Sequence, residues 1–169
     1  MNRLKITGGK PLKGTVKIAG AKNAASKMII ASLLTEDEVV LENVPLQQET
    51  DIARELVEML GATTSQSDHT MTIAAKKIAN TSALAQTRKN RLPILLVAPL
   101  LHRVGEAHIP APGGDKIGPR PVNFHVETLE KMGAKVEENK DGFHFKVDGR
   151  LKGVKIELPY PSVGATETA

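Results

Sequence analysis

The sequence predicts an α/β fold built from repeated βαβα units, and three observations lead to this prediction. Leu60-Gly61-Ala62 recurs as Met132-Gly133-Ala134, a shift along the chain of 133 − 61 = 72. Each copy follows apolar residues at helical spacing and precedes a short strand-like segment. Gly20-Ala21-Lys22-Asn23-Ala24-Ala25 recurs in part as Gly164-Ala165-Thr166-Glu167-Thr168-Ala169, at twice this shift. A period of this size indicates one supersecondary unit repeated along the chain.

Two helices are predicted at equivalent positions of the two complete units. Their apolar residues recur at i, i+4 and i+7, which gives one continuous apolar stripe on a helix. Gly61 and Gly133 follow these patterns, at the position where a left-handed residue commonly ends a helix. The apolar positions are Ile52, Leu56, Met59 and Leu60 in the first copy, and Val122, Val126 and Leu129 in the second.

A strand is predicted after each of these helices, at Met71–Ile73 and Phe143–Val147. Connecting strands are predicted at Thr15–Ile18 and Val154–Leu158. The helix Ala24–Leu34 carries few polar residues on any side, so we expect it to be buried among the repeats. Helices packed on sheets in this way define the α/β class.

The second unit contains a longer connection than the first. Ala31–Leu34 matches Ala98–Leu101 at a shift of 67, so the second unit has gained several residues before the shift of 72 returns. The gain falls within residues 110–121, where Gly and Pro flank Asp115 and Lys116. One interpretation of this segment is a mobile lid that carries an acid and a base over a pocket. The other interpretation is a turn exposed to solvent.

A candidate anion site lies at the first predicted helix. Lys22 and Asn23 stand at its start, where backbone N–H groups and a Lys ammonium attract anions. The alternative is a simple turn in which Asn23 caps the helix. Arg91 opens the corresponding helix of the second unit, and it is either directed by the repeat symmetry toward the same cleft or an ordinary surface charge. His125 begins the helix after the long connection, as a cleft residue or a cap.

Composition excludes several classes of protein. The net charge is +4 without a long basic run, and aromatic residues are 2%, which argues against nucleic-acid binding. The absence of Cys excludes disulfides and fits a cytoplasmic location. No segment has the length of a membrane span. The five His residues lack metal-ligand spacing, so we expect no metal and no other cofactor.

Four motifs in order resemble the UDP-N-acetylglucosamine 1-carboxyvinyltransferases, a family of enolpyruvyl transferases. The motifs are Gly20–Ala25, Pro112–Val122, Asp148–Gly153 and Ser162–Thr166. The resemblance covers the whole chain and implies an inside-out α/β barrel of six such units in two domains. It implies transfer of enolpyruvyl from phosphoenolpyruvate to the 3′-hydroxyl of UDP-N-acetylglucosamine, with release of phosphate, in peptidoglycan synthesis.

The resemblance also assigns site residues. It implies that Lys22 and Asn23 contact phosphoenolpyruvate, and that Arg91 and Arg120 neutralise substrate phosphates. The residues that would hold the uridine nucleotide are Arg120, Pro121, Val122, Asn123, Phe124, Tyr160, Ser162, Val163 and Gly164.

Two positions depart from the family pattern. Asp115 stands where most members carry a Cys that protonates the enol ether, and an Asp can do this only with a raised pKa. The site should therefore resist epoxides that alkylate the family's Cys. Tyr160 stands where many relatives carry a Lys, so this position lacks the cation that would contact a phosphate there.

The same resemblance implies that this chain is an incomplete, truncated N-terminal portion. Residues 1–21 would belong to the second domain, and residues 22–169 to an incomplete substrate-binding domain with the catalytic loop 110–121. We expect little turnover from the chain alone, a need for the missing C-terminal domain or chain, and self-association through uncovered apolar faces. The alternatives are a 5-enolpyruvylshikimate-3-phosphate synthase-like enzyme and a non-catalytic module that binds a nucleotide sugar.

Overall fold

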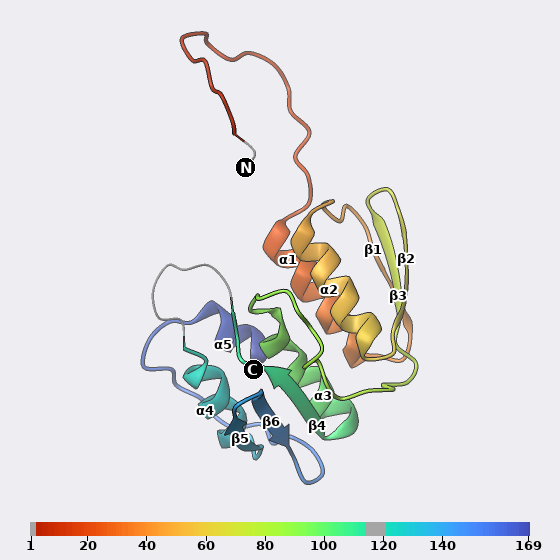
Figure 1. Ribbon diagram of the computed structural model, residues 1–169, viewed down its shortest axis with the longest axis vertical. Helices are drawn as coiled ribbons and strands as arrows, with labels where there is room; N and C mark the ends of the chain where they lie inside the picture. Colours follow the sequence, from red (N-terminus) through yellow and green to blue (C-terminus); the bar gives the residue numbers. More distant parts are fainter. Residues whose placement is uncertain (1–2, 114–120) are drawn as a thin grey trace.

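The computed structural model describes residues 3–113 and 121–169. Its main feature is one arrangement that occurs twice, in the order helix, strand, helix, and a two-stranded hairpin (Figure 1). The α/β class and the repeat are therefore confirmed, but each unit is αβαββ rather than βαβα. The first copy comprises α1 Lys22–Ala31, η1 Ser32–Leu34, β1 Glu38–Leu41, α2 Gln48–Met59, β2 Thr63–Ser67 and β3 Thr70–Ala74. The second comprises η2 Leu92–Leu96, α3 Val97–Val104, β4 Glu106–Pro110, α4 Asn123–Lys131, β5 Lys135–Asn139 and β6 Gly142–Lys146, and α5 Val163–Thr168 follows it.

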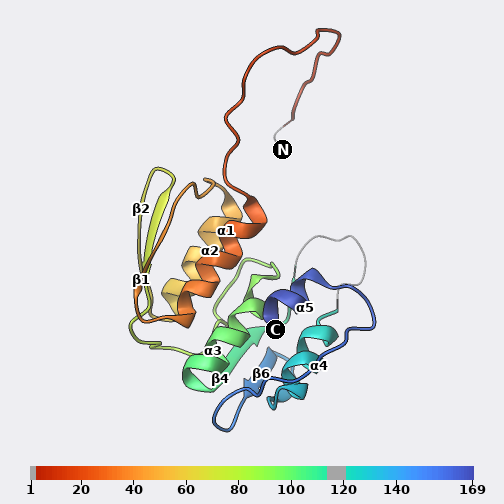
Figure 2. The same ribbon diagram turned by 180° about the vertical axis from the view of Figure 1, so that it is seen from behind.

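Each copy forms its own antiparallel three-stranded sheet. The strand orders are β1-β3-β2 and β4-β6-β5, so the last strand of each copy is central. The hairpins repeat at the predicted shift of 72, which separates the starts of β2 and β5 (135 − 63) and those of β3 and β6 (142 − 70). The first helical segments of the two copies contact each other, α1 with η2 and η1 with α3 (Figures 1 and 2).

The predicted glycine ends of α2 and α4 are confirmed. Gly61 and Gly133 have φ of +105° and +103°, a region that glycine enters without a Cβ clash. The next amide donates to a carbonyl of the last turn in both copies, from Ala62 to Val57 and from Ala134 to Leu129. With the 5→2 bonds of the two glycine amides, this is the Schellman arrangement. It turns the chain directly from each helix into the following edge strand.

A single apolar core joins the two copies. Leu33 at the end of the first helical segment and Leu100 and Leu101 in α3 are fully buried. Ile73 and Phe145 occupy equivalent positions of the two central strands and are also fully buried. Burial of these side chains supplies the main favourable term for association of the two units.

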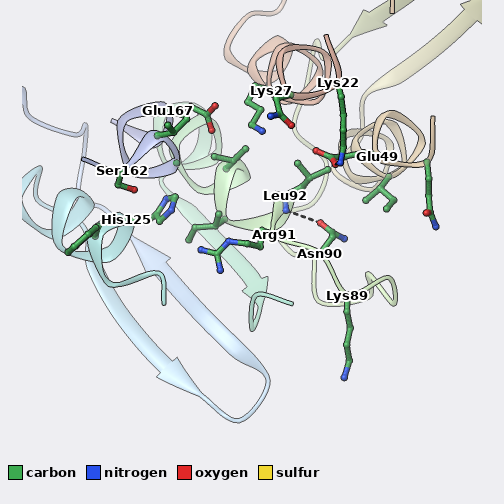
Figure 3. Close-up of a pocket in the computed structure, with 18 of the residues that line it drawn as sticks. Lys22, Lys27, Glu49, Lys89, Asn90, Arg91, Leu92, His125, Ser162 and Glu167 are labelled. Carbon is green, nitrogen blue, oxygen red and sulfur yellow. Dashed lines mark hydrogen bonds and ion pairs between the residues drawn. The ribbon is translucent and has the colours of Figure 1, made fainter. Parts of the chain in front are cut away.

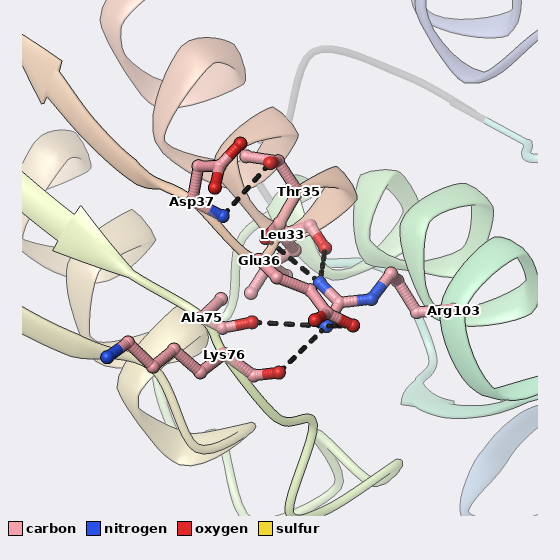
Figure 4. A network of polar contacts seen from close by, with 7 residues as sticks. All are labelled: Leu33, Thr35, Glu36, Asp37, Ala75, Lys76 and Arg103. Carbon is pink, nitrogen blue, oxygen red and sulfur yellow. Dashed lines mark hydrogen bonds and ion pairs between the residues drawn. The ribbon is translucent and has the colours of Figure 1, made fainter.

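Arg103 connects the two copies on one side of this core (Figure 4). Its guanidinium donates hydrogen bonds to the carbonyls of Leu33 (2.8 Å) and Thr35 (3.0 Å), at the end of the first helical segment. It also donates to the carbonyls of Ala75 and Lys76, both at 3.2 Å, after β3. Arg103 lies at the end of α3 with its side chain only 11% exposed. From there it donates to four backbone carbonyls of the first copy.

Several sequence predictions are wrong. Thr15–Ile18 and Val154–Leu158 form no strands, and residues 3–19 extend away from the rest as an exposed segment (Figure 1). A strand needs a partner for its backbone groups, and neither segment has a ladder in the described structure. The first helical segment is buried on one side only, since Met28 is 51% exposed. Its N-cap is Ala21, not Asn23.

The assignment of residues 1–21 to another domain and of residues 22–169 to a substrate-binding domain stays a prediction. In the part of the chain that the structure describes, no helix has the length and apolar character required to cross a membrane.

Candidate functional site

A cavity of about 860 Å³ lies between the two copies, at the starts of several helices (Figure 3). The first turns of α1, α2 and α4 all contribute to its lining. The N-cap positions of these three helices are Ala21, Gln47 and Val122, and none of the three makes a side-chain capping bond in the described structure. Helix starts carry unsatisfied N–H groups and a partial positive charge. Their convergence favours an anionic ligand.

The charged side chains add to this preference. Four cationic side chains line the cavity against two carboxylates, a balance of 4 − 2 = +2. Lys22 and Glu49 form an ion pair, with 2.7 Å between Nζ and Oε2. The Arg91 guanidinium donates to the carbonyl of Pro121 at 3.3 Å. The charged lining residues are Lys22, Lys27, Lys89, Arg91, Glu49 and Glu167.

Four polypeptide segments distant in sequence bring the predicted residues together. Lys22 comes from the first copy and Arg91 from the equivalent helix start of the second copy, as the repeat symmetry predicted. Ser162 lies at the start of α5, where its hydroxyl accepts a hydrogen bond from the Ala165 amide at 3.2 Å. The predicted residues that line the cavity are Lys22, Asn23, Arg91, Pro121, Phe124, Ser162, Val163 and Gly164.

Other predicted residues lie elsewhere. Val122 and Asn123 line a smaller neighbouring cavity of about 460 Å³. Tyr160 is 68% exposed and is absent from the lining of the large cavity. Asp115 and Arg120, together with Lys116, lie outside the described residues. The roles assigned to all of these residues stay predictions.

His125 is a cleft residue rather than a helix cap. It is 5% exposed, and its Nδ1 lies 2.7 Å from the Thr168 hydroxyl of α5. Burial, and secondarily the nearby Arg91 charge, lower the pKa of His125 to about 4. The ring is therefore neutral at pH 7 and joins α4 to α5. A Cβ added at Gly164 would approach this ring to 3.1 Å, so glycine permits the close contact.

Sequence reasoning missed the acidic residues of the cavity. Glu49 was not predicted, although a signal existed: the shift of 72 relates it to Pro121, which was predicted. Glu49 lies in the first turn of α2, a helix start that was not among the predicted sites. Lys27 and Glu167 were also missed, and they lie beyond the first turns of α1 and α5.

The described residues contain one group of side chains with the geometry to hold a metal, and this group lies outside the cavity. It consists of Glu106, His108 and His144. The expectation of no metal relied on spacing along the sequence, whereas these side chains come from two paired strands.

Comparison with known proteins identifies the family. Residues 6–169 match the family model described as EPSP synthase (3-phosphoshikimate 1-carboxyvinyltransferase). The chain is 45% identical over 168 residues to a UDP-N-acetylglucosamine 1-carboxyvinyltransferase of Shewanella amazonensis and 43% identical over 170 residues to that of Granulibacter bethesdensis. Both alignments cover 99% of this chain, which spans 40% of the length of each relative.

Solved structures show the same fold. The enolpyruvyl transferase NikO from Streptomyces tendae matches with a TM-score of 0.66 and 22% identity, over 86% of this chain and 32% of that one. An EPSP synthase from Acinetobacter baumannii matches with a TM-score of 0.70 and 17% identity, over 95% of this chain and 38% of that one. The predicted enolpyruvyl transferase-like fold is thereby confirmed, and the chain belongs to the EPSP synthase family of carboxyvinyltransferases.

Proposed function

We propose that this chain supplies the nucleotide-sugar and phosphoenolpyruvate site of a UDP-N-acetylglucosamine 1-carboxyvinyltransferase. The observation that carries the proposal is the cavity in which Lys22, Asn23 and Arg91 meet the Ser162–Gly164 segment. Relatives at 43–45% identity that bear this name support the choice of substrates. The reaction would transfer enolpyruvyl from phosphoenolpyruvate to the 3′-hydroxyl of UDP-N-acetylglucosamine and release phosphate, in cytoplasmic peptidoglycan synthesis.

Each lining group has a role that its chemistry supports. The Lys22 ammonium and Asn23 would bind phosphoenolpyruvate at the start of α1, where helix N–H groups also attract the phosphate. Arg91 would neutralise a substrate phosphate, for which its five donors are well suited. Backbone groups near Pro121 and Val163 would hold the uridine nucleotide. The Lys22–Glu49 pair means that an incoming phosphate competes with a carboxylate for the same cation.

Asp115 would protonate the methylene carbon as the tetrahedral intermediate forms. This role needs a protonated carboxyl group and therefore a raised pKa in the closed site. Further catalytic groups would come from polypeptide beyond this chain, because catalysis depends on positioned groups on opposite sides of the substrate. We therefore propose that the chain binds substrates but turns them over only with that remainder.

Binding measurements test the proposal. Calorimetric titration with UDP-N-acetylglucosamine, with and without phosphoenolpyruvate, should give one site per chain. Replacing Arg91→Met removes a charged phosphate contact, for which we expect at least a tenfold loss of affinity, given about 1.5–3 kcal/mol per such bond. Lys140→Met is the matched control, since Lys140 is an exposed cation outside the cavity, and should change affinity less than about twofold.

The two alternatives predict different results. Shikimate 3-phosphate binding more tightly than the nucleotide sugar would favour a 5-enolpyruvylshikimate-3-phosphate synthase-like enzyme. Nucleotide-sugar binding without phosphate release, even after the remaining polypeptide of a relative is added, would favour a non-catalytic module. Phosphate release by the purified chain alone would contradict the proposed need for additional groups.

A further inference from the structure

The outer face of the second sheet carries three potential metal ligands that the proposed reaction does not use. His108 of β4 lies directly opposite His144 of β6 in the antiparallel register. Glu106 stands two positions before His108, so it lies on the same face of the strand. None of the three lines the substrate cavity. The ladder therefore gathers two imidazoles and one carboxylate at a single point of the sheet.

The distances among these groups fit one bound ion. Glu106 Oε1 lies 2.9 Å from His144 Nε2 and 3.6 Å from His108 Nε2. All three ligand atoms lie within 4.8 Å of one another. Ligands at the usual zinc distances around a tetrahedral ion are about 3.3 Å apart, a value between these two distances. Because the two imidazole rings are stacked, at least one of them would have to turn for both nitrogen lone pairs to point at the same ion.

The two imidazoles are already ordered relative to each other. Their ring centroids are 4.0 Å apart, and the ring planes differ by 8°. The core does not need these rings, because the buried face of the same strands carries Ala107, Ile109 and Phe145, all fully buried. The three side chains are 24–39% exposed, so an ion can reach them from solvent. Packing of the core therefore does not account for the two imidazoles of His108 and His144 on this face of the sheet.

The first repeat offers an internal comparison. The register that pairs His108 with His144 pairs Val40 with Thr72 in the first sheet. Glu38 occupies the position equivalent to Glu106, by the same shift that relates Val40 to His108. The first sheet therefore has the same backbone geometry and a carboxylate, but no imidazole at these positions.

We propose that Glu106, His108 and His144 form a binding site for one divalent transition-metal ion of the zinc class. Two imidazoles and a carboxylate suit Zn²⁺, Ni²⁺ and Co²⁺ better than the hard ions Mg²⁺ or Ca²⁺. Three protein ligands leave a fourth position for water. The ion would link β4 to β6 on the solvent side of the second sheet, a link that the first sheet lacks.

Titration of the tag-free chain with Zn²⁺ tests this site, with Co²⁺ as a spectroscopic probe. We expect one ion per chain and the visible absorption of tetrahedral Co²⁺. The substitutions His108→Val and His144→Thr introduce the residues of the first repeat at these positions. Since even outer groups of metal sites contribute about 10- to 100-fold to affinity, loss of either ligand should weaken Zn²⁺ binding by about 100-fold or more. His102→Asn, at an exposed position of α3, should leave binding unchanged.

A second measurement needs no substitution. Zn²⁺ should shift the imidazole proton resonances of His108 and His144 in the wild-type chain, while those of His69, His102 and His125 stay in place. Circular dichroism of each variant in chelator checks that the fold is retained. Two results would overturn the proposal. One is an equal shift of the resonances of all exposed imidazoles, and the other is a Zn²⁺ affinity of the His144→Thr variant that equals that of the wild type.

Discussion

The two repeats share a backbone plan and differ in what surrounds it. Both have the same sheet order and the same helix endings at Gly61 and Gly133. The connection between the first strand and the second helix spans 42–47 in one copy and 111–122 in the other, so it is twice as long in the second. The outer sheet faces differ as well, with Val40 and Thr72 against His108 and His144. Core packing restricts the shared part, whereas loops and solvent-facing positions change at little energetic cost.

The largest effect should come from the shared core. Phe145→Ala removes a fully buried ring from the second central strand, and we expect a loss of about 4 kcal/mol of unfolding free energy. Ile73→Ala at the equivalent position of the first repeat should cost about 3 kcal/mol. Urea unfolding measures both. A loss below about 1.5 kcal/mol in either variant would mean that its strand is not packed as described.

The contact between the repeats should contribute nearly as much. Arg103→Met keeps the aliphatic part of the side chain but leaves the carbonyls of Leu33, Thr35, Ala75 and Lys76 without their donor. We expect a loss of about 3 kcal/mol in urea unfolding. Arg88→Met is the control, because its pair with Glu55 is exposed, and it should cost less than about 0.5 kcal/mol. Equal losses in the two variants would rule out the bridging role.

A pH dependence should distinguish the second repeat from the first. The pKa of His125 is about 4 in the folded chain, below the usual 6.5, so the unfolded chain binds the proton more readily between these values. Stability should therefore fall as the pH drops from about 6.5 to about 4, by about 2 kcal/mol at pH 5 relative to pH 7.5.

The matched variant for this test is His125→Ala, since the repeat shift of 72 places Ala53 at the equivalent position of the first copy. The difference in unfolding free energy between pH 7.5 and pH 5 should shrink by the same amount in this variant. A pH dependence identical to that of the wild type would show that other groups cause it.

The smallest effect is a difference between two glycines. A Cβ at Gly61 would lie 2.8 Å from the Ala79 Cβ, whereas a Cβ at Gly133 would meet nothing within 4 Å. Both positions have positive φ, so alanine is strained at each, by about 1 kcal/mol. Gly61→Ala should cost about 1 kcal/mol more than Gly133→Ala because of the added clash. Equal shifts of the urea midpoint would show that the chain around Ala79 yields without cost.

The parts of the fold that were predictable from the sequence are those with a strong apolar period. The helices around Leu56 and Leu129 and the central strands near Ile73 and Phe145 were found, because each buries a row of apolar side chains. The edge strands β2 and β5 were missed, because Thr63–Ser67 is polar throughout and Lys135–Asn139 has a single apolar residue. Edge strands are held by backbone hydrogen bonds to one neighbouring strand, and such bonds leave no apolar pattern in the sequence.

Predictability of the sites follows a similar division. Lys22 was predicted because it stands at the start of a helix, and Arg91 because the repeat relates its helix to that one. Glu49 and Lys27 were missed because their positions in the cavity depend on how separate helices pack. Glu106, His108 and His144 come together only through strand register, which spacing along the chain does not reveal.

Arg103 has a consequence for the distant cavity. The helical segments 22–34 and 92–104 both start at the cavity and both finish at this guanidinium, about 20 Å away at the usual rise per residue. The Arg103 hydrogen bonds hold the two helical segments together at one end. A small change in the angle between the segments there therefore changes the distance between Lys22 and Arg91 at the other end. Ligand affinity should therefore respond to a residue that no ligand touches.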